Sequence, residues 1–113
     1  MGNVPLYEAK AELFKTLAHP ARIRVLELLQ NGPRPVHELL DDLDVEASNL
    51  SQQLGVLRRA GLVHSSREGA TVLYTLATPD VAELLLHARR ILAALWGEQQ
   101  QLLESLRASS ETG

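Results

Sequence analysis

The run from Val45 to Val63 constrains the fold of this 113-residue chain more than any other segment. Leu50, Leu54 and Leu57 recur at i, i+4 and i+7, which is the spacing of one apolar stripe on an α-helix. Gly61 follows and fits the left-handed residue that closes a helix. The segment therefore predicts a short helix, buried along one side, that ends just before an extended apolar segment.

The other side of this helix is polar and uncharged. Lys and Glu, the usual residues of a solvated face, do not occur between Ala47 and Val56, whereas Ser and Asn, which lower helix propensity, do. Asn and Gln can pair with adenine in the major groove, Ser reaches bases or phosphates, and Arg suits phosphate oxygens. An uncharged surface without a nucleic-acid role is the alternative. The residues expected to contact DNA are Ser48, Asn49, Ser51, Gln52, Gln53, Arg58 and Arg59.

A second short helix is expected just before this one. Pro33 and Pro35 bracket its start, where proline is tolerated, and an apolar stripe runs from Val36 to Leu43. Asp44 and Val45 then make a tight connection. Two short helices joined in this way, the second with a polar outer face, predict a helix-turn-helix over residues 36–60.

Two extended segments follow, from Leu62 to Arg67 and from Ala70 to Leu76. Alternate positions of the second are apolar or aromatic, and Glu68-Gly69 between the segments resembles a weak version of the Asp-Gly turn signal. A β-hairpin directly after a recognition helix is a wing, so we expect a wing over residues 62–76. Arg67 near its tip is placed to reach a DNA backbone or minor groove, and an ordinary exposed arginine is the alternative.

Composition agrees with a single globular domain over residues 1–113. The length falls in the single-domain range, and 45% of the residues are hydrophobic. No apolar run is long enough to span a bilayer, and the N-terminus lacks the basic-then-apolar pattern of a signal peptide. The absence of cysteine excludes disulfides and thiol chemistry. We therefore expect a cytoplasmic protein with no membrane partner.

The net charge of −3 argues mildly against a protein that coats DNA without specificity. The position of the charges matters more than their sum. Acidic residues cluster between Glu38 and Glu46, where a solvated face is favoured over a role in limiting non-specific binding. Arg22 and Arg24 join the three arginines already named in the segments expected to approach a duplex.

The N-terminal helix is expected to have a broad apolar side that includes Leu6 and Leu13. His19-Pro20 interrupts it, and Pro20 can open the next helix, which is expected to end near Asn31-Gly32.

The C-terminal helix is expected over residues 79–107, with Thr78 as its cap. Its apolar residues follow alternating spacings of four and three, which is a heptad seam with one polar member. A small domain cannot cover so long a seam, so we expect a second copy to do so, with packing inside one chain as the alternative. The residues expected at the dimer interface are Leu6, Leu13, Leu85, Leu92, Leu95, Gln99 and Leu102.

This order of elements resembles the ArsR/SmtB family of dimeric bacterial repressors, from about Leu6 to Leu106. The residues that carry the resemblance are Leu17 to Leu26, Leu50 to Val63, Arg67-Glu68-Gly69 and Tyr74. The resemblance implies a mainly α winged helix-turn-helix fold of order α-α-α-α-β-β-α, dimeric through its N- and C-terminal helices. It also implies binding to an inverted-repeat DNA operator, and an effector, often a metal ion, that changes DNA affinity.

The family's metal sites carry over poorly. One uses cysteines on the first helix of the motif, and the corresponding stretch from Val36 to Leu43 holds none. Another uses four ligands on the last helix, of which Asp80 matches one, while Ala82, Ala93 and Trp96 occupy the other positions. No cofactor is therefore required, and a small effector or accessory protein stays open.

One weaker metal candidate remains. Glu83 and His87 are spaced i, i+4 on the last helix and share a face, and such donors suit nickel, zinc or cobalt. The favoured alternative is a surface pair without metal, because two ligands fall short of the usual four.

Enzymatic readings find little support, because the chain has no cysteine nucleophile and no phosphate-binding glycine loop. We therefore expect no enzyme. The serious alternative to a DNA-binding regulator is a winged-helix module that binds other proteins and never touches DNA.

Overall fold

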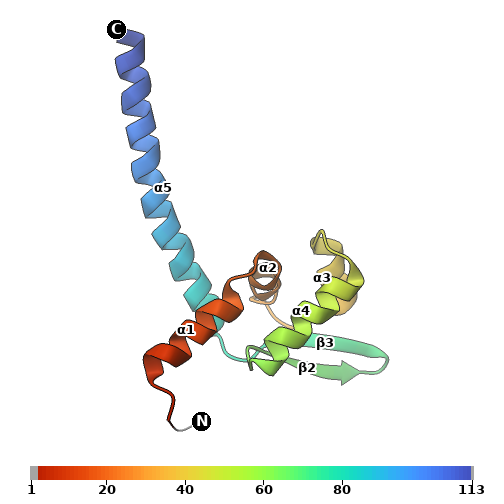
Figure 1. The fold of residues 1–113 in the computed structure, drawn as a ribbon. Coiled ribbons are helices and arrows are strands. Elements are labelled where there is room, and N and C mark those ends of the chain that lie inside the picture. The colour runs from red at the N-terminus through yellow and green to blue at the C-terminus, as the bar shows by residue number, and fades with distance from the viewer. Residues whose placement is uncertain (1–2, 113) are drawn as a thin grey trace. The chain divides into compact units, whose positions relative to one another are not determined.

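The computed structural model describes residues 3–112 and is mainly helical, with one small antiparallel sheet. The winged helix-turn-helix architecture predicted from the sequence is confirmed. The chain divides into two compact units between Ala82 and Glu83, which are described separately. Its elements are α1 (Leu6–Leu17), α2 (Pro20–Leu28), β1 (Arg34–Pro35), α3 (Val36–Asp42), α4 (Ala47–Arg59), β2 (Val63–Glu68), β3 (Thr71–Leu76) and α5 (Asp80–Thr112) (Figure 1).

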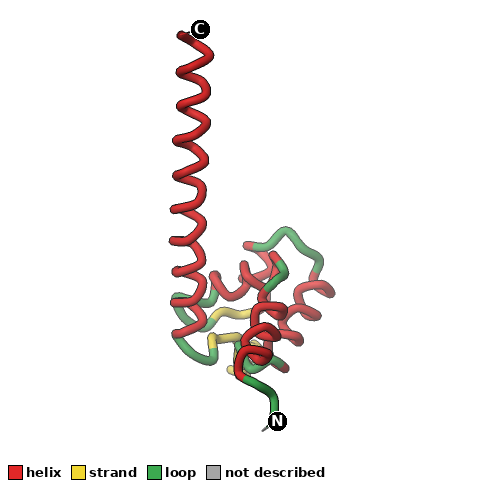
Figure 2. The backbone as a smooth tube through the Cα atoms, turned by 60° about the vertical axis from the view of Figure 1, so that its left-hand side comes forward, coloured by secondary structure: helices red, strands yellow, loops and turns green. Residues whose placement is uncertain are grey.

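The sheet has three strands in the order β1-β3-β2, and both pairings are antiparallel. The sequence did not predict β1, because a two-residue strand is too short to show alternation. Figure 2 shows the strands in yellow; β1 is a brief stretch between α2 and α3 along the chain, and it pairs with β3.

The hairpin turn lies one residue later than the sequence predicted. Glu68 pairs with Thr71, so the two turn residues are Gly69 and Ala70 rather than Glu68 and Gly69. Gly69 has φ +64°, whereas no non-glycine residue described has a positive φ. A two-residue turn with glycine in the first central position is the II′ signature, which matches the twist of the strands.

The end of α4 is a Schellman motif, as the glycine at position 61 suggested. Gly61 has φ +80° and its N–H donates to the carbonyl of Arg58 at 3.0 Å. The N–H of Leu62 donates to the carbonyl of Leu57, also at 3.0 Å. These two bonds satisfy carbonyls that the helix end leaves free, and they turn the chain directly into β2.

The core of the first unit is made by side chains from every helix of the unit and from β2. Val25, Leu26, Leu39 and Leu57 have no exposed surface, and Leu50 retains 1%. Because the leucine stripe of α4 packs into this core, the opposite side of α4 is fixed outward. This orientation sets the position of the candidate site.

The helix α5 is 33 residues long and continuous, which corresponds to about 50 Å. It begins after Thr78, whose Oγ1 accepts a hydrogen bond from the Asp80 N–H at 3.3 Å, as a cap should. The sequence predicted an end at residue 107, but the helix continues to Thr112. The chain from residue 98 to Thr112 contains no glycine or proline to stop it earlier.

The second helix is shorter than expected. It ends at Leu28, and Leu29 is its cap residue, whereas the sequence placed the end near Asn31-Gly32. Gly32, with φ +131°, lies in the turn that follows. Among residues 3–112, no helix combines the length and apolar character that a bilayer crossing requires.

Candidate nucleic-acid interface

The outer face of α4 carries the polar residues singled out in the sequence. Ser48, Ser51 and Gln52 are exposed, and Asn49 is half-buried at the edge of this face. Arg58 and Arg59 are exposed in the last turn. The helix therefore presents hydroxyl and amide groups along its first two turns and two cations at its end.

Gln53 does not belong to this outer face. Only 6% of its surface is exposed, and both ends of its amide are used inside the protein. Its Oε1 accepts from Arg22 Nε at 2.7 Å, and its Nε2 donates to Asn49 Oδ1 at 2.9 Å. The expectation that Gln53 contacts bases directly is therefore corrected: a buried amide with satisfied hydrogen bonds has no group to offer DNA.

Arg22 is also directed into the protein rather than toward solvent. Besides Gln53, it donates from Nη1 to the carbonyl of Thr16 at 3.0 Å. Thr16 lies in the last turn of α1, where carbonyls lack partners within the helix and the helix dipole favours a cation. Arg22 thus joins α1, α2 and α4 through two of its donors, and its approach to DNA stays a prediction.

The wing is exposed on both faces of its edge strand. In β2 only Val63 is buried, and all five following residues, from His64 to Glu68, are exposed. Arg67 lies opposite Val72, one pair before the end of the ladder. Because the strand from His64 to Glu68 contributes little to the core, the side chains of these residues are free to meet a ligand.

The arginines near the helix-turn-helix differ in whether they form salt bridges. Arg34 Nη2 lies 2.7 Å from Asp42 Oδ2 and 4.0 Å from Glu38 Oε1, so two of the clustered acidic groups are paired. Within the residues that the structure describes, no carboxylate forms a salt bridge with Arg58, Arg59 or Arg67. These three cations therefore remain available to phosphate oxygens.

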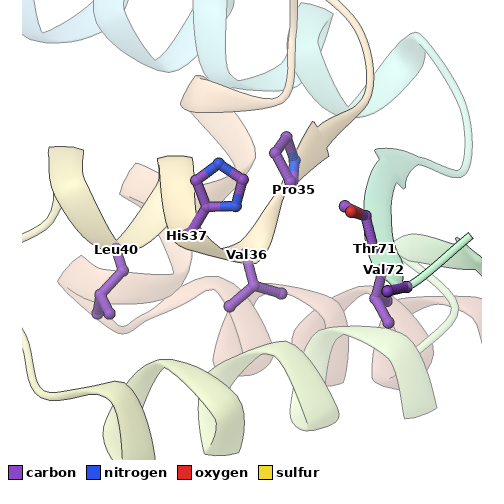
Figure 3. Close-up of a pocket in the computed structure, with 7 residues that line it drawn as sticks. Pro35, Val36, His37, Leu40, Thr71 and Val72 are labelled. Carbon is purple, nitrogen blue, oxygen red and sulfur yellow. The ribbon is translucent and has the colours of Figure 1, made fainter. Parts of the chain in front are cut away.

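A shallow hollow of about 400 Å³ lies between the start of α3 and the start of β3. Figure 3 shows Pro35, Val36, His37 and Leu40 on one side, and Thr71 and Val72 on the other. The hollow has the volume of a small-molecule pocket. Its lining is mainly apolar and contains one imidazole and no carboxylate, which suits an apolar molecule better than a metal ion.

The metal candidates Glu83 and His87 are exposed on α5. In the part of the chain that the structure describes, no three His, Cys, Asp or Glu side chains come together as a metal-binding group. The pair therefore remains a two-ligand hypothesis.

The residues expected at a dimer interface are mostly exposed. Leu6 on α1 is 69% exposed and Leu13 is half-buried. On α5, Leu92 and Leu95 are 44% and 50% exposed. Leu106, also on the seam, is exposed, and four further exposed apolar residues of α5 lie off the seam: Leu86, Ile91, Trp96 and Leu103. Leu102 and Gln99 are exposed as well, and Leu85 is half-buried.

Comparison with known proteins gives consistent similarities. The helix-turn-helix domain family matches residues 17–66. The uncharacterized HTH-type transcriptional regulator Rv0081 of Mycobacterium tuberculosis is 58% identical over 109 residues, covering 96% of each chain. The HTH-type transcriptional repressor SmtB of the same species is 41% identical over 83 residues, covering 74% of this chain and 62% of SmtB.

Two solved structures extend the similarity to three dimensions. The crystal structure of Rv0081 aligns with a TM-score of 0.78, over 86% of this chain and 98% of that one, at 58% identity. The homodimeric winged helix-turn-helix DNA-binding domain Mb0332 from Mycobacterium bovis, described as a possible ArsR-family regulator, aligns with a TM-score of 0.69 at 31% identity. That alignment covers 78% of this chain and 82% of Mb0332.

Proposed function

This chain belongs to the ArsR/SmtB family of helix-turn-helix transcriptional regulators, and from that premise we propose that it is a cytoplasmic, homodimeric repressor of an inverted-repeat DNA operator. One observation carries the proposal. The outer face of α4 is polar and uncharged, and exposed arginines without carboxylate partners lie at its end and on the wing. No catalytic role is proposed.

In this function α4 enters the major groove. Ser48, Ser51 and Gln52 face the base edges, which their hydroxyl and amide groups can read. Arg58 and Arg59 meet phosphates at the end of the helix, and Arg67 meets the backbone or minor groove beside the wing. Asn49 contributes from the edge of the same face.

A second copy supplies the other half-site. The dimer interface is proposed to consist of Leu6 and Leu13 of α1 and of the α5 seam: Leu85, Leu92, Leu95, Gln99 and Leu102. Two recognition helices about one turn of B-DNA apart, roughly 34 Å, then read two halves of an inverted repeat. Dimerisation thus links the C-terminal helix to operator affinity.

A small effector or accessory protein is proposed as the signal that changes operator affinity. The chain has no thiol, so a thiolate metal site is excluded. The remaining metal hypothesis is nickel, zinc or cobalt bound by Glu83 and His87, which supply only two of the usual four ligands. Adding each metal to the operator complex tests it by the change in affinity.

The main test is a titration of the full-length protein against the DNA upstream of its own gene, repeated between about 50 and 200 mM salt. We expect saturable binding whose log affinity falls linearly with log salt, with a slope near −0.9 for each phosphate neutralised. No binding to this DNA, or binding that salt leaves unchanged, would favour the alternative of a module that binds proteins.

Arg67→Ala sharpens this test. Loss of one phosphate contact is expected to weaken binding to operator DNA and to random DNA to a similar degree. It should also reduce the magnitude of the slope of log affinity against log salt by about 1. The matched control is Arg90→Ala, because Arg90 is an exposed arginine of α5, outside the segments expected to approach a duplex. An unchanged slope in Arg67→Ala removes the wing arginine from the proposed interface.

A further inference from the structure

Arg22, Gln53 and Asn49 form a chain of hydrogen bonds that runs from the interior to the edge of the outer face of α4. We propose that this chain fixes the orientation of the Asn49 amide, so that Asn49 offers its Nδ2 donor to DNA and selects a base edge carrying an acceptor. The inference rests on the proposed function and names a specificity determinant of its recognition helix.

Arg22 determines which atom donates and which accepts in each of these hydrogen bonds. A guanidinium has donors only, so Gln53 must turn its Oε1 toward Arg22 Nε, 2.7 Å away. The other end of the Gln53 amide is then Nε2, which is a donor and lies 2.9 Å from Asn49. Asn49 must therefore turn Oδ1 toward Gln53, which leaves Nδ2 at the opposite end of its planar amide.

The packing of the three residues holds this orientation in place. Gln53 is only 6% exposed, and reversing its amide would bring a donor against Arg22 inside the protein. Arg22 is anchored a second time by the Thr16 carbonyl at 3.0 Å. Asn49 and Gln53 are one turn apart on the same side of α4, where their side chains are neighbours. An unsatisfied buried group costs more than a hydrogen bond contributes, so the reversed orientation is disfavoured.

The orientation restricts the bases that Asn49 reads. Bidentate pairing with adenine needs both the oxygen and the nitrogen of the amide aimed at one base. With Oδ1 turned toward Gln53, Asn49 has its donor left for the duplex. The major-groove acceptors are purine N7, guanine O6 and thymine O4, whereas cytosine N4 is a donor. Asn49 is therefore expected to discriminate against cytosine at one position in each half-site.

The test is selection of binding sites from a randomised DNA duplex library by the wild-type protein and two variants. In Gln53→Glu, one carboxylate oxygen still accepts from Arg22, but the other now faces Asn49 as an acceptor. Asn49 must then reverse, turning Nδ2 inward and Oδ1 toward DNA. We expect the preferred base at the Asn49 position to change to one that presents a donor, cytosine or adenine.

Asn49→Asp is the second variant, because a carboxylate has no donor to offer. We expect it to shift the base preference at the same operator position toward cytosine. Each shift should alter the relative affinity of the competing bases by roughly 5-fold, the lower end of the range for a bidentate contact, because Asn49 makes a single hydrogen bond. Gln53 is buried, so any effect of its substitution on a base must act through Asn49.

Gln52→Glu is the matched control, since it makes the same change at the neighbouring, exposed position. It should leave the base preference at the operator position contacted by Asn49 unchanged. Circular dichroism checks that each variant is folded, and if Gln53→Glu is not, Asn49→Asp carries the test. A wild-type protein that enriches no sequence contradicts the proposed function. If the wild-type protein enriches a sequence and the variants show the same base preference at every position, the inference is overturned and the proposed function stands.

Discussion

The two compact units of this chain differ in where their apolar side chains are covered. In the first unit, up to Ala82, the leucine stripes of the helices are buried within the unit itself, and Leu26 and Leu57 have no exposed surface. In α5 from Glu83 on, none of the side chains described is buried, and Ile91 and Trp96 are 62% and 58% exposed. The first unit contains its own core, whereas the long helix has apolar side chains that its own unit leaves exposed.

With α5 as the proposed dimer interface, stability and association depend on separate segments of the chain. A substitution in the first unit should act on folding of the unit. A substitution on the seam of α5 should act on dimerisation, and through it on the operator. Matched substitutions in covered and uncovered environments test this separation.

The largest effect is expected from Leu92→Glu on the α5 seam. A buried charge in a dimer interface should yield monomers, measured by sedimentation. Losing the second recognition helix then lowers operator affinity by about 100-fold or more, since two linked sites bind far more tightly than one. Leu86→Glu is the control, because Leu86 is 40% exposed on the same helix and lies off the heptad seam. A Leu92→Glu protein that remains dimeric would remove α5 from the interface.

The next effect is a loss of core packing in the first unit. Leu26 is fully buried, so Leu26→Ala should lower the free energy of unfolding by about 2–5 kcal/mol, the range for a large-to-small core substitution. Urea denaturation measures it. Leu86→Ala, in contrast, should cost less than about 1 kcal/mol. Similar costs at the two positions would mean that α5 is covered as completely as the core.

A smaller effect is expected from Arg22→Ala, which leaves the Gln53 Oε1 and the Thr16 carbonyl without their donor. An unsatisfied buried acceptor costs about 1–3 kcal/mol, to be measured as a lower unfolding free energy.

Arg24→Ala provides the contrast on the same helix. Arg24 and Glu27 are 54% and 43% exposed, and exposed ion pairs contribute about 1 kcal/mol or less. If both substitutions have equally small effects, the bonds of Arg22 do not stabilise the junction of three helices.

The sequence predicted the helices and the wing because their patterns are local. The leucine stripe of α4, the cap at Thr78 and the glycine at position 61 each act within a few residues. Gln53 was misplaced although a signal existed: it lies three residues after Leu50 and four before Leu57, on the apolar side. It was assigned to the DNA-contacting face because amides can pair with bases, although its spacing places it on the buried side of the helix.

The partner of Gln53 was beyond sequence reasoning. Arg22 is 31 residues away in the chain, and only the packing of α2 against α4 brings the two together. The same holds for β1, whose pairing with β3 joins residues some 40 positions apart. Local periodicity predicts which elements form, and tertiary contacts decide which polar residues of those elements remain free for DNA.

The smallest effects are expected from two glycines with opposite roles. Gly61 has φ +80° and no atom within 4 Å of an added Cβ, so Gly61→Ala is opposed by backbone strain alone. The left-handed conformation costs an L-residue about 1–2 kcal/mol, and unfolding should become easier by that amount. Gly97, inside α5, also has open space around an added Cβ. There Gly97→Ala should stabilise the helix by about 0.5–1 kcal/mol, because alanine loses less backbone freedom than glycine.

Thermal unfolding followed by circular dichroism measures both changes, and their signs test the comparison between the units. Gly97 lies off the heptad seam, so a partner helix on that seam leaves its added methyl group free. If Gly97→Ala proves destabilising, something must pack against that side of α5 in solution. The dimer interface would then have to be moved from the seam through Leu92 and Leu95 to the side that Gly97 occupies.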